Sequence, residues 1–362
     1  MMAMSRLSHA HIWLPGLIRD LAGSRPRAEE ITDVYFCFAD HYEPGWREAD
    51  LTLQRSRVTA WLDRYPAVAA RHHDSDGRCP QHSFFFPAEE YQAEHLDRLA
   101  SFCRAGWGDV EVHLHHDRDT AAGFRDKILE FTQVLHSRHG LLRKDTAGPV
   151  QYGFIHGNWV LNNSGRDGEG CGVDDETSIL METGCYADFT MPCAPHPAQC
   201  RKVNSIYYTL PSNKPRAHDS GVDAQVGKNA PPGLLMIQGP LNLNRTSRKW
   251  GLIPRVESAD VSSYNPPNAV RCSLWLDSHV HVTGAPEHVF IKVSTHGAQE
   301  RNMDLLFSTG FEDLWSSLER LAGRHGFRLH YVTAFEMFNR VREIESGTSR
   351  VSVEPAVEVR ER

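Results

Sequence analysis

The sequence has no apolar run approaching the roughly 20 residues that a helix needs to cross a bilayer. The first 27 residues also lack the continuous apolar core of a signal peptide, because Pro15, Arg19 and Asp20 interrupt it. Hydrophobic residues make up 40% and charged residues 23% of the chain, which is ordinary for a soluble globular protein. We therefore expect a folded, cytoplasmic chain with no transmembrane segment.

An excess of basic charge is also missing. The formal net charge is −7, and the Lys and Arg residues are scattered, so nucleic acid is not an expected partner. The eight cysteines include no CxxC pair, which disfavours a zinc finger. Cys37 lies in an apolar run, where a buried free thiol is expected, and such cysteine usage fits a reducing cytoplasm.

Motifs of several enzyme classes are absent as well. There is no GxGxxG, no P-loop, no HExxH and no GxSxG, so the sequence does not support a nucleotide-binding, zincin or serine-esterase function. Histidine, in contrast, is abundant, with 21 residues. Imidazole is the commonest metal-ligand side chain, but many histidines are structural, so we give weight only to those at the ends of predicted strands.

Short apolar runs alternate with segments of helical periodicity. Strands are predicted at residues 31–38, 82–87, 109–113, 150–155, 186–191, 288–294 and 329–333. Between them, apolar residues recur at helical spacing, as in Phe124, Ile128, Phe131 and Leu135. This alternation predicts parallel strands joined by helical crossovers, and we expect a (β/α) barrel of about seven strands.

The alternation also suggests a domain organisation. Residues 1–30 form an N-terminal extension, residues 31–344 the barrel, and residues 345–362 a flexible tail. The segment 204–282 is rich in Pro, Asn, Ser and Gly, and we expect a loop-rich insertion over the mouth of the barrel. A small second domain is the alternative for this segment.

Polar side chains follow three of the predicted strands. Asp40 ends the first strand, His113 and His115 share one face at the end of the third, and His296 follows the strand at 288–294. In parallel barrels, catalytic groups collect at the carboxyl ends of the strands. We therefore predict that Asp40, His113 and His115 bind a divalent metal ion. The alternatives are a turn aspartate and a solvated histidine-rich turn.

Further residues near the same ends are candidates for catalysis and substrate binding. His41 or Glu43 is the expected general base, and His296 the expected general acid, because a histidine titrates near neutral pH. His156 and Trp159 follow the strand at 150–155, and the indole face can stack on a sugar ring. Trp159 as a simple core residue is the alternative. Arg271 is an additional, less specific candidate for binding substrate.

The order of these segments resembles that of the polysaccharide deacetylase superfamily. Five segments carry the resemblance: Phe38–His41 at the place of the paired aspartates, His82–Phe86 at the Thr-Phe-Phe strand, His113–His116 at the two-histidine metal motif, Gly184–Phe189 at the Gly-Tyr-Asp segment, and His296 at the late catalytic histidine. The similarity extends loosely over residues 31–335.

This resemblance implies a distorted (β/α) barrel, a metal ion that we expect to be zinc, and a saccharide substrate. It also implies that Asp188 orients a histidine by a hydrogen bond. Two positions depart from the family pattern. Ala39 replaces one of the paired aspartates, so His41 or Glu43 must serve as base. Asp117 stands where the second histidine is expected, so the second histidine-motif ligand is His115, His116 or Asp117.

Together these observations predict a zinc-dependent hydrolase that removes an acyl group from an N-acylated saccharide or saccharide precursor. Two alternatives remain. A glycoside hydrolase would need a carboxylate facing Asp40 or Glu43. A saccharide-binding barrel without catalysis would explain Ala39 at the place of an aspartate. The sequence does not predict the sugar, the acyl group or the oligomeric state.

Overall fold

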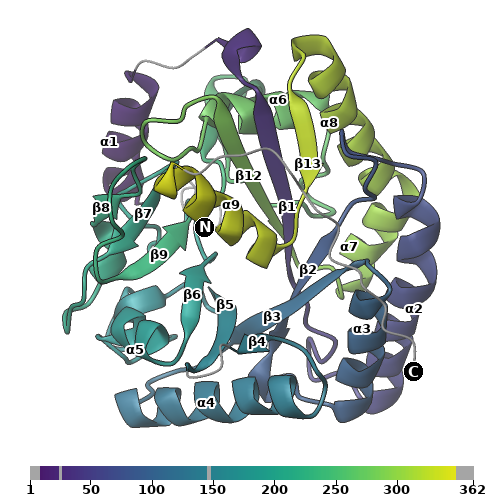
Figure 1. Cartoon of the computed structure of the whole chain (residues 1–362), viewed down its shortest axis with the longest axis vertical. Helices are drawn as coiled ribbons and strands as arrows, with labels where there is room; N and C mark the ends of the chain where they lie inside the picture. Colours follow the sequence, from purple (N-terminus) through teal and green to yellow (C-terminus); the bar gives the residue numbers. More distant parts are fainter. Residues whose placement is uncertain (1–8, 24–26, 145–147, 348–362) are drawn as a thin grey trace.

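The computed structural model describes residues 9–23, 27–144 and 148–347, and it shows a large, mostly parallel sheet surrounded by helices (Figure 1). The strands of this sheet are β1 (Asp33–His41), β2 (His82–Pro87), β3 (Gly108–Leu114), β4 (Arg143–Lys144), β5 (Val150–His156), β6 (Cys185–Asp188), β7 (Ile206–Thr209), β8 (Val222–Asp223), β9 (Leu234–Ile237), β12 (His288–Thr295) and β13 (Arg328–Tyr331). A separate hairpin consists of β10 (Asn242–Lys249) and β11 (Ile253–Glu257).

Helices cover both faces of the sheet. They are α1 (Ala10–Leu21), α2 (Leu51–Ala69), α3 (Ala93–Arg104), α4 (Ala121–Ser137), α5 (Glu176–Glu182), α6 (Ala269–Ser278), α7 (Glu300–Leu305), which continues as a π-helical turn to Gly310, α8 (Phe311–His325) and α9 (Ala334–Ser346). In Figure 1, α2, α3, α4 and α8 lie around the outside of the sheet, and α9 lies across the opposite side. We call the face toward α9 the inner face and the other the outer face.

The predicted parallel pairing is confirmed. β1 pairs in parallel with β12, β13 and β2, and the parallel order continues through β3, β5, β6 and β9. Only β4, β7 and β8 join the sheet in antiparallel fashion. The carboxyl ends of β1, β3, β5 and β12 therefore lie along one edge. Among the strands that the structure describes, hydrogen-bonded neighbours run from β12 to β8 without closing a ring.

Alternation along β1 determines where the residues at its end project. Phe38 packs in the core beneath the outer helices, whereas Ala39 belongs to the inner core that Met337 of α9 completes. Successive strand residues point to opposite faces, so Asp40 follows Phe38 outward and His41 follows Ala39 inward. Asp40 and His41, which are neighbours in the sequence, therefore lie on opposite faces of the sheet.

The structure differs from the sequence prediction outside the parallel strands. Residues 204–282 were expected to form an insertion over the mouth of the barrel, but β7 and β9 within this segment are strands of the main sheet. Helix α9 continues to Ser346, and Glu345 accepts a hydrogen bond from the Tyr208 hydroxyl (2.7 Å), so these residues of the predicted tail are folded. The rest of the segment predicted as a tail, from residue 348, lies outside the described residues. Within residues 9–23, 27–144 and 148–347, no helix is long and apolar enough to cross a membrane.

Candidate metal centre

A single carboxylate joins residues from three strand ends. Glu43, two residues beyond β1, is only 5% exposed. Its Oε1 lies 3.4 Å from Nε2 of His113 and 3.2 Å from Nε2 of His115, and its Oε2 lies 3.0 Å from Nδ1 of His296. We call His41, Glu43, His113, His115 and His296 the Glu43 centre. Its members could hold a metal ion as Glu43–His113–His115 or as His41–Glu43–His296.

The Nδ1 atoms of two of these histidines already have polar partners. Nδ1 of His113 lies 2.9 Å from the carbonyl oxygen of Ile155, and Nδ1 of His115 contacts the Glu89 carboxylate. A carbonyl only accepts, so Nδ1 of His113 donates to it, and Nε2 is the nitrogen that faces Glu43. Histidine ligands of metal ions commonly have this arrangement, in which a backbone carbonyl or a carboxylate fixes the tautomer and orients the ring.

His41 is the least solvated histidine of the centre apart from His113. Its ring centroid lies 4.8 Å from that of His113 and 4.6 Å from that of His296, and its Nδ1 is buried without a hydrogen-bond partner. Burial, together with the neighbouring His296 and His113, lowers the pKa of His41 well below its ordinary value. The ring is therefore neutral at neutral pH.

Glu43, His115 and His296 are held in charged forms. Burial opposes ionisation of Glu43, but hydrogen bonds from His113, His115 and His296 outweigh it and keep its pKa well below the usual range. Burial likewise opposes protonation of His115, yet Glu43 and Glu89 raise its pKa to about 10. Glu43 also raises the pKa of His296 against the effect of burial. A carboxylate and two imidazolium groups thus face one another.

The centre is open to solvent on one side. The His115 and His296 side chains are 33% and 24% exposed, whereas that of His113 is buried. Trp159 is half-buried beside this opening, with its ring centroid 6.3 Å from that of His296. A small molecule that reaches His296 would therefore also meet the Trp159 ring.

The structure does not bring Asp40 to His113 and His115. The Asp40 carboxylate is buried on the outer face, where Oδ2 lies 2.9 Å from Nε2 of His82 and Oδ1 accepts the Gly297 amide (2.7 Å). In the part of the chain that the structure describes, no compact group of metal-ligand side chains includes Asp40. Glu43, which the sequence suggested as a base, occupies that place instead.

Three of the four residues expected to bind substrate or to orient a histidine lie away from the Glu43 centre. The buried guanidinium of Arg271 forms a two-point ion pair with Glu257, at 2.7 Å for both contacts. Asp188 accepts hydrogen bonds from the amide and hydroxyl of Thr190, whose hydroxyl accepts the backbone amide of His156. Asp188 thus acts on the backbone of His156, and the ring of His156 belongs to a second group.

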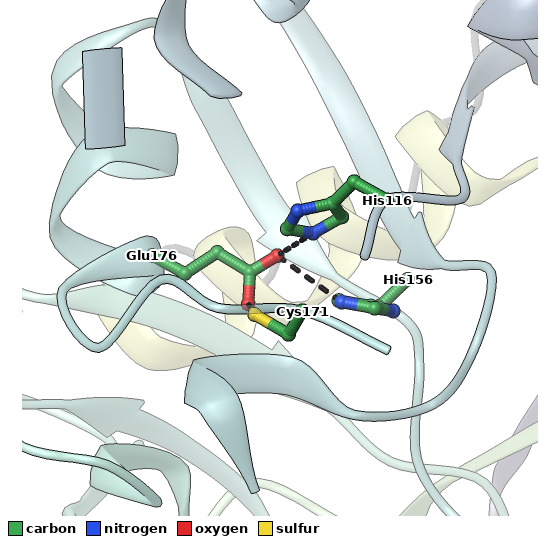
Figure 2. Close-up of side chains that lie close together, drawn as sticks. All are labelled: His116, His156, Cys171 and Glu176. Atoms are coloured by element: carbon green, nitrogen blue, oxygen red, sulfur yellow. Dashed lines mark hydrogen bonds and ion pairs between the residues drawn. The ribbon is translucent and has the colours of Figure 1, made fainter. Parts of the chain in front are cut away.

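That second group is buried on the outer face. Glu176 Oε1 lies 3.2 Å from Nε2 of His116 and 3.6 Å from Nε2 of His156, and Oε2 lies 3.4 Å from Sγ of Cys171 (Figure 2). All four side chains are buried, and they could hold a metal ion. We call them the buried cluster. Sequence reasoning considered His116 and His156 but missed Cys171 and Glu176, because they occur at no spacing typical of a zinc motif.

The alternatives for the second histidine-motif ligand therefore separate in space. His115 lies in the Glu43 centre, His116 lies in the buried cluster, and Asp117 caps the loop by accepting the Gly170 amide (2.7 Å). Comparisons with models of known protein families and with curated proteins found no match for this chain. Its function must therefore follow from the geometry of these side chains.

Proposed function

We propose that this chain is a metal-dependent hydrolase that removes an acyl group from an N-acylated saccharide or saccharide precursor at the Glu43 centre. The main support is the arrangement around Glu43, where His113 and His115 present Nε2 to one carboxylate while their Nδ1 atoms are engaged elsewhere. Imidazole and carboxylate donors suit zinc. Glu43, His113 and His115 would hold the ion, with Glu43 in the role first expected of Asp40.

A bound zinc ion would supply an activated water and polarise the acyl carbonyl group. The neutral His41 ring, with its unpartnered Nδ1, would accept the proton of the attacking water. His296, which Glu43 keeps protonated, would donate a proton to the departing amine, which leaves poorly as an anion. Two histidines with opposite environments thus divide the base and acid roles.

The saccharide part of the proposal rests on Trp159. Its half-buried ring lies beside His296 at the open side of the centre, where a sugar ring could stack while its acylated nitrogen reaches His296. The amide part rests on His296 itself, because a protonated group next to the metal ligands is what an amine leaving group requires.

We also propose that the sheet is an open, distorted (β/α) barrel. The support is the approach of β12, one end of the sheet, to the segments that follow β6 and β9. Nζ of Lys292 in β12 donates to the carbonyl oxygen of Phe189, just after β6, at 2.6 Å. Gly239, just after β9, lies so close to β12 that a Cβ atom there would be 2.3 Å from the carbonyl oxygen of Lys292. The remaining gap is therefore bridged by a side chain and by close backbone packing.

The first test is metal content by elemental analysis of wild type, His113→Ala, Glu43→Gln and His296→Ala, with His136→Ala in α4 as a control outside both groups. We expect the first two variants to lose one equivalent of zinc and the control to lose none. His296→Ala should keep its metal but release acetate from N-acetylated sugars about 10²- to 10⁴-fold more slowly, as expected for loss of a general acid.

Full metal content in both His113→Ala and Glu43→Gln would contradict this ligand set. Sugar turnover that survives complete removal of the metal would instead favour a glycosidase that uses two carboxylates.

A further inference from the structure

The buried cluster gathers four potential ligands from separate parts of the chain. His116 follows β3, His156 ends β5, Cys171 lies in the loop after β5, and Glu176 begins α5. Figure 2 shows their polar ends pointing toward one point, and their ligand atoms all lie within 4.8 Å of one another. The His116 ring stacks on Phe124 of α4, with 4.8 Å between centroids, so the cluster is closed off on the outer face.

One nitrogen that faces the other ligand atoms of this cluster lacks a hydrogen-bond partner. Nε2 of His156 is buried and unpaired, with Glu176 Oε1 at 3.6 Å. Nδ1 of His116 lies on the far side of its ring, 3.5 Å from Oδ2 of Asp119. A buried polar atom left unpaired costs about 1–3 kcal/mol. In folded proteins, a buried polar atom without a protein partner commonly binds an ordered water molecule or an ion.

The sulfur of Cys171 accepts two backbone hydrogen bonds. Sγ lies 3.3 Å from the amide nitrogen of Asn163 and 3.4 Å from that of Val173, and both amides point toward it as donors. Burial and the Glu176 carboxylate raise the pKa of the Cys171 thiol, which donates to Glu176 Oε2 (3.4 Å) in the metal-free protein. The two amides would support the thiolate once an ion replaces that proton. Glu176 is supported similarly, because its Oε2 accepts the amide of Asn162 at 2.7 Å.

We propose that the buried cluster is a second, structural zinc site, held by His116, His156, Cys171 and Glu176. A thiolate and a carboxylate balance the two charges of the ion, and the thiol proton leaves to solvent on binding. Mixed nitrogen and sulfur donors select zinc over magnesium or calcium. Four protein ligands with no exposed position describe a structural site rather than a catalytic one.

Binding has a structural consequence at His156. Its Nδ1 accepts the Asn158 amide (3.1 Å), so coordination through Nε2 requires the ring proton to move to Nδ1 and the amide to turn away. The site would also fasten both ends of the loop between β5 and α5. That loop carries Trp159 to His296, so the second ion would position a residue of the proposed substrate site.

Cobalt(II) tests this proposal independently of the hydrolase, because the Glu43 centre contains no cysteine. Metal-free protein is titrated with cobalt(II) chloride while the near-ultraviolet thiolate-to-cobalt band is recorded. We expect a band that saturates at one ion per chain, survives His113→Ala and disappears in Cys171→Ser. Cys79→Ser is the control, because this half-exposed thiol lies near His73 (3.8 Å) and could bind cobalt at the surface.

The wild type alone can refute the proposal, whether or not Cys171→Ser folds. A folded wild type that shows no thiolate-to-cobalt band, at cobalt concentrations that fill the Glu43 centre, would overturn it. So would a band that persists in folded Cys171→Ser or disappears in Cys79→Ser. Loss of hydrolysis in His113→Ala with the band intact would leave this inference standing and bear only on the Glu43 centre.

Discussion

At the scale of single residues, the backbone of Gly157 supports the ring of His115. A Cβ atom on Gly157 would lie 2.3 Å from that ring, which is closer than any side chain can tolerate. The ring approaches Glu43 only because the glycine leaves this space free. The position of one proposed metal ligand thus depends on a residue with no side chain of its own.

Gly157→Ala should therefore weaken metal binding without unfolding the protein. The added methyl group displaces the His115 ring from Glu43, and we expect zinc affinity at the Glu43 centre to fall about 10- to 100-fold, as for other residues that orient ligands. Competition with a chromophoric chelator measures this. Gly323→Ala in α8 is the matched control, because a Cβ atom there would meet no other atom within 4 Å. Equal affinity in both variants would contradict the role assigned to Gly157.

Lys292 provides a second test at this scale. Burial lowers the pKa of its ammonium group to about 8, although the nearby Asp188 acts against this. Between pH 8 and the ordinary lysine value near 10.4, the unfolded chain binds more protons than the folded one, so this residue makes stability rise with pH.

We expect the free energy of unfolding of wild type, relative to Lys292→Met, to increase by about 3 kcal/mol between pH 7.5 and 10.5. Urea unfolding of both proteins at several pH values measures this difference, and the comparison cancels contributions from the cysteines. A difference that stays constant with pH would show that Lys292 titrates normally.

At the scale of elements, β1, β2 and β3 were predictable because each is a short apolar run buried on both faces. Helix α2 was not predicted, since its buried residues include Arg57, whose guanidinium bonds to the carbonyl of Pro44 (2.7 Å) and to Glu300. A charged residue in the buried stripe hides the helical period. β7 and β9 were also hidden, because each has only four residues and pairs with a distant partner.

Helix α6 is attached to the end of β11 by a buried ion pair between Arg271 and Glu257. We expect Arg271→Met to destabilise the protein by about 3–5 kcal/mol, because it leaves the Glu257 carboxylate buried and unpaired. The double variant with Glu257→Gln should recover part of this loss, since the Trp275 indole, which donates to Glu257 in the wild type (2.9 Å), can donate equally to an amide oxygen. Thermal or urea unfolding measures both, and a single variant as stable as wild type would contradict this expectation.

At the scale of the whole molecule, the C-terminal helix completes the inner core. Met337 is buried against the inner face of the sheet, whereas Glu343 on the same helix is exposed. Met337→Ala should lower the free energy of unfolding by about 2–5 kcal/mol, and Glu343→Ala by less than about 0.5 kcal/mol. Equal effects in urea unfolding would show that α9 is not part of the cooperative core.

The candidate site was predictable only in part. Strand-end reasoning selected His41, Glu43, His113, His115 and His296, and these residues do lie together. It could not decide between Asp40 and Glu43, because that choice depends on which face each side chain occupies beyond the end of β1. The buried cluster could not be predicted, because the conformation of the long loop between β5 and α5 brings Cys171 and Glu176 to His116, and the sequence does not show that conformation.

His115 and His116 are adjacent in the chain but serve groups on opposite faces of the sheet. A substitution can therefore remove one group and leave the other, whereas deletion of a single residue within β3 would exchange the two faces and disrupt both. Single-base substitutions can therefore alter the Glu43 centre or the buried cluster separately, whereas deletion of one codon in frame would disrupt both. Insertions and deletions in this strand should consequently be far less tolerated during evolution than changes of residue type.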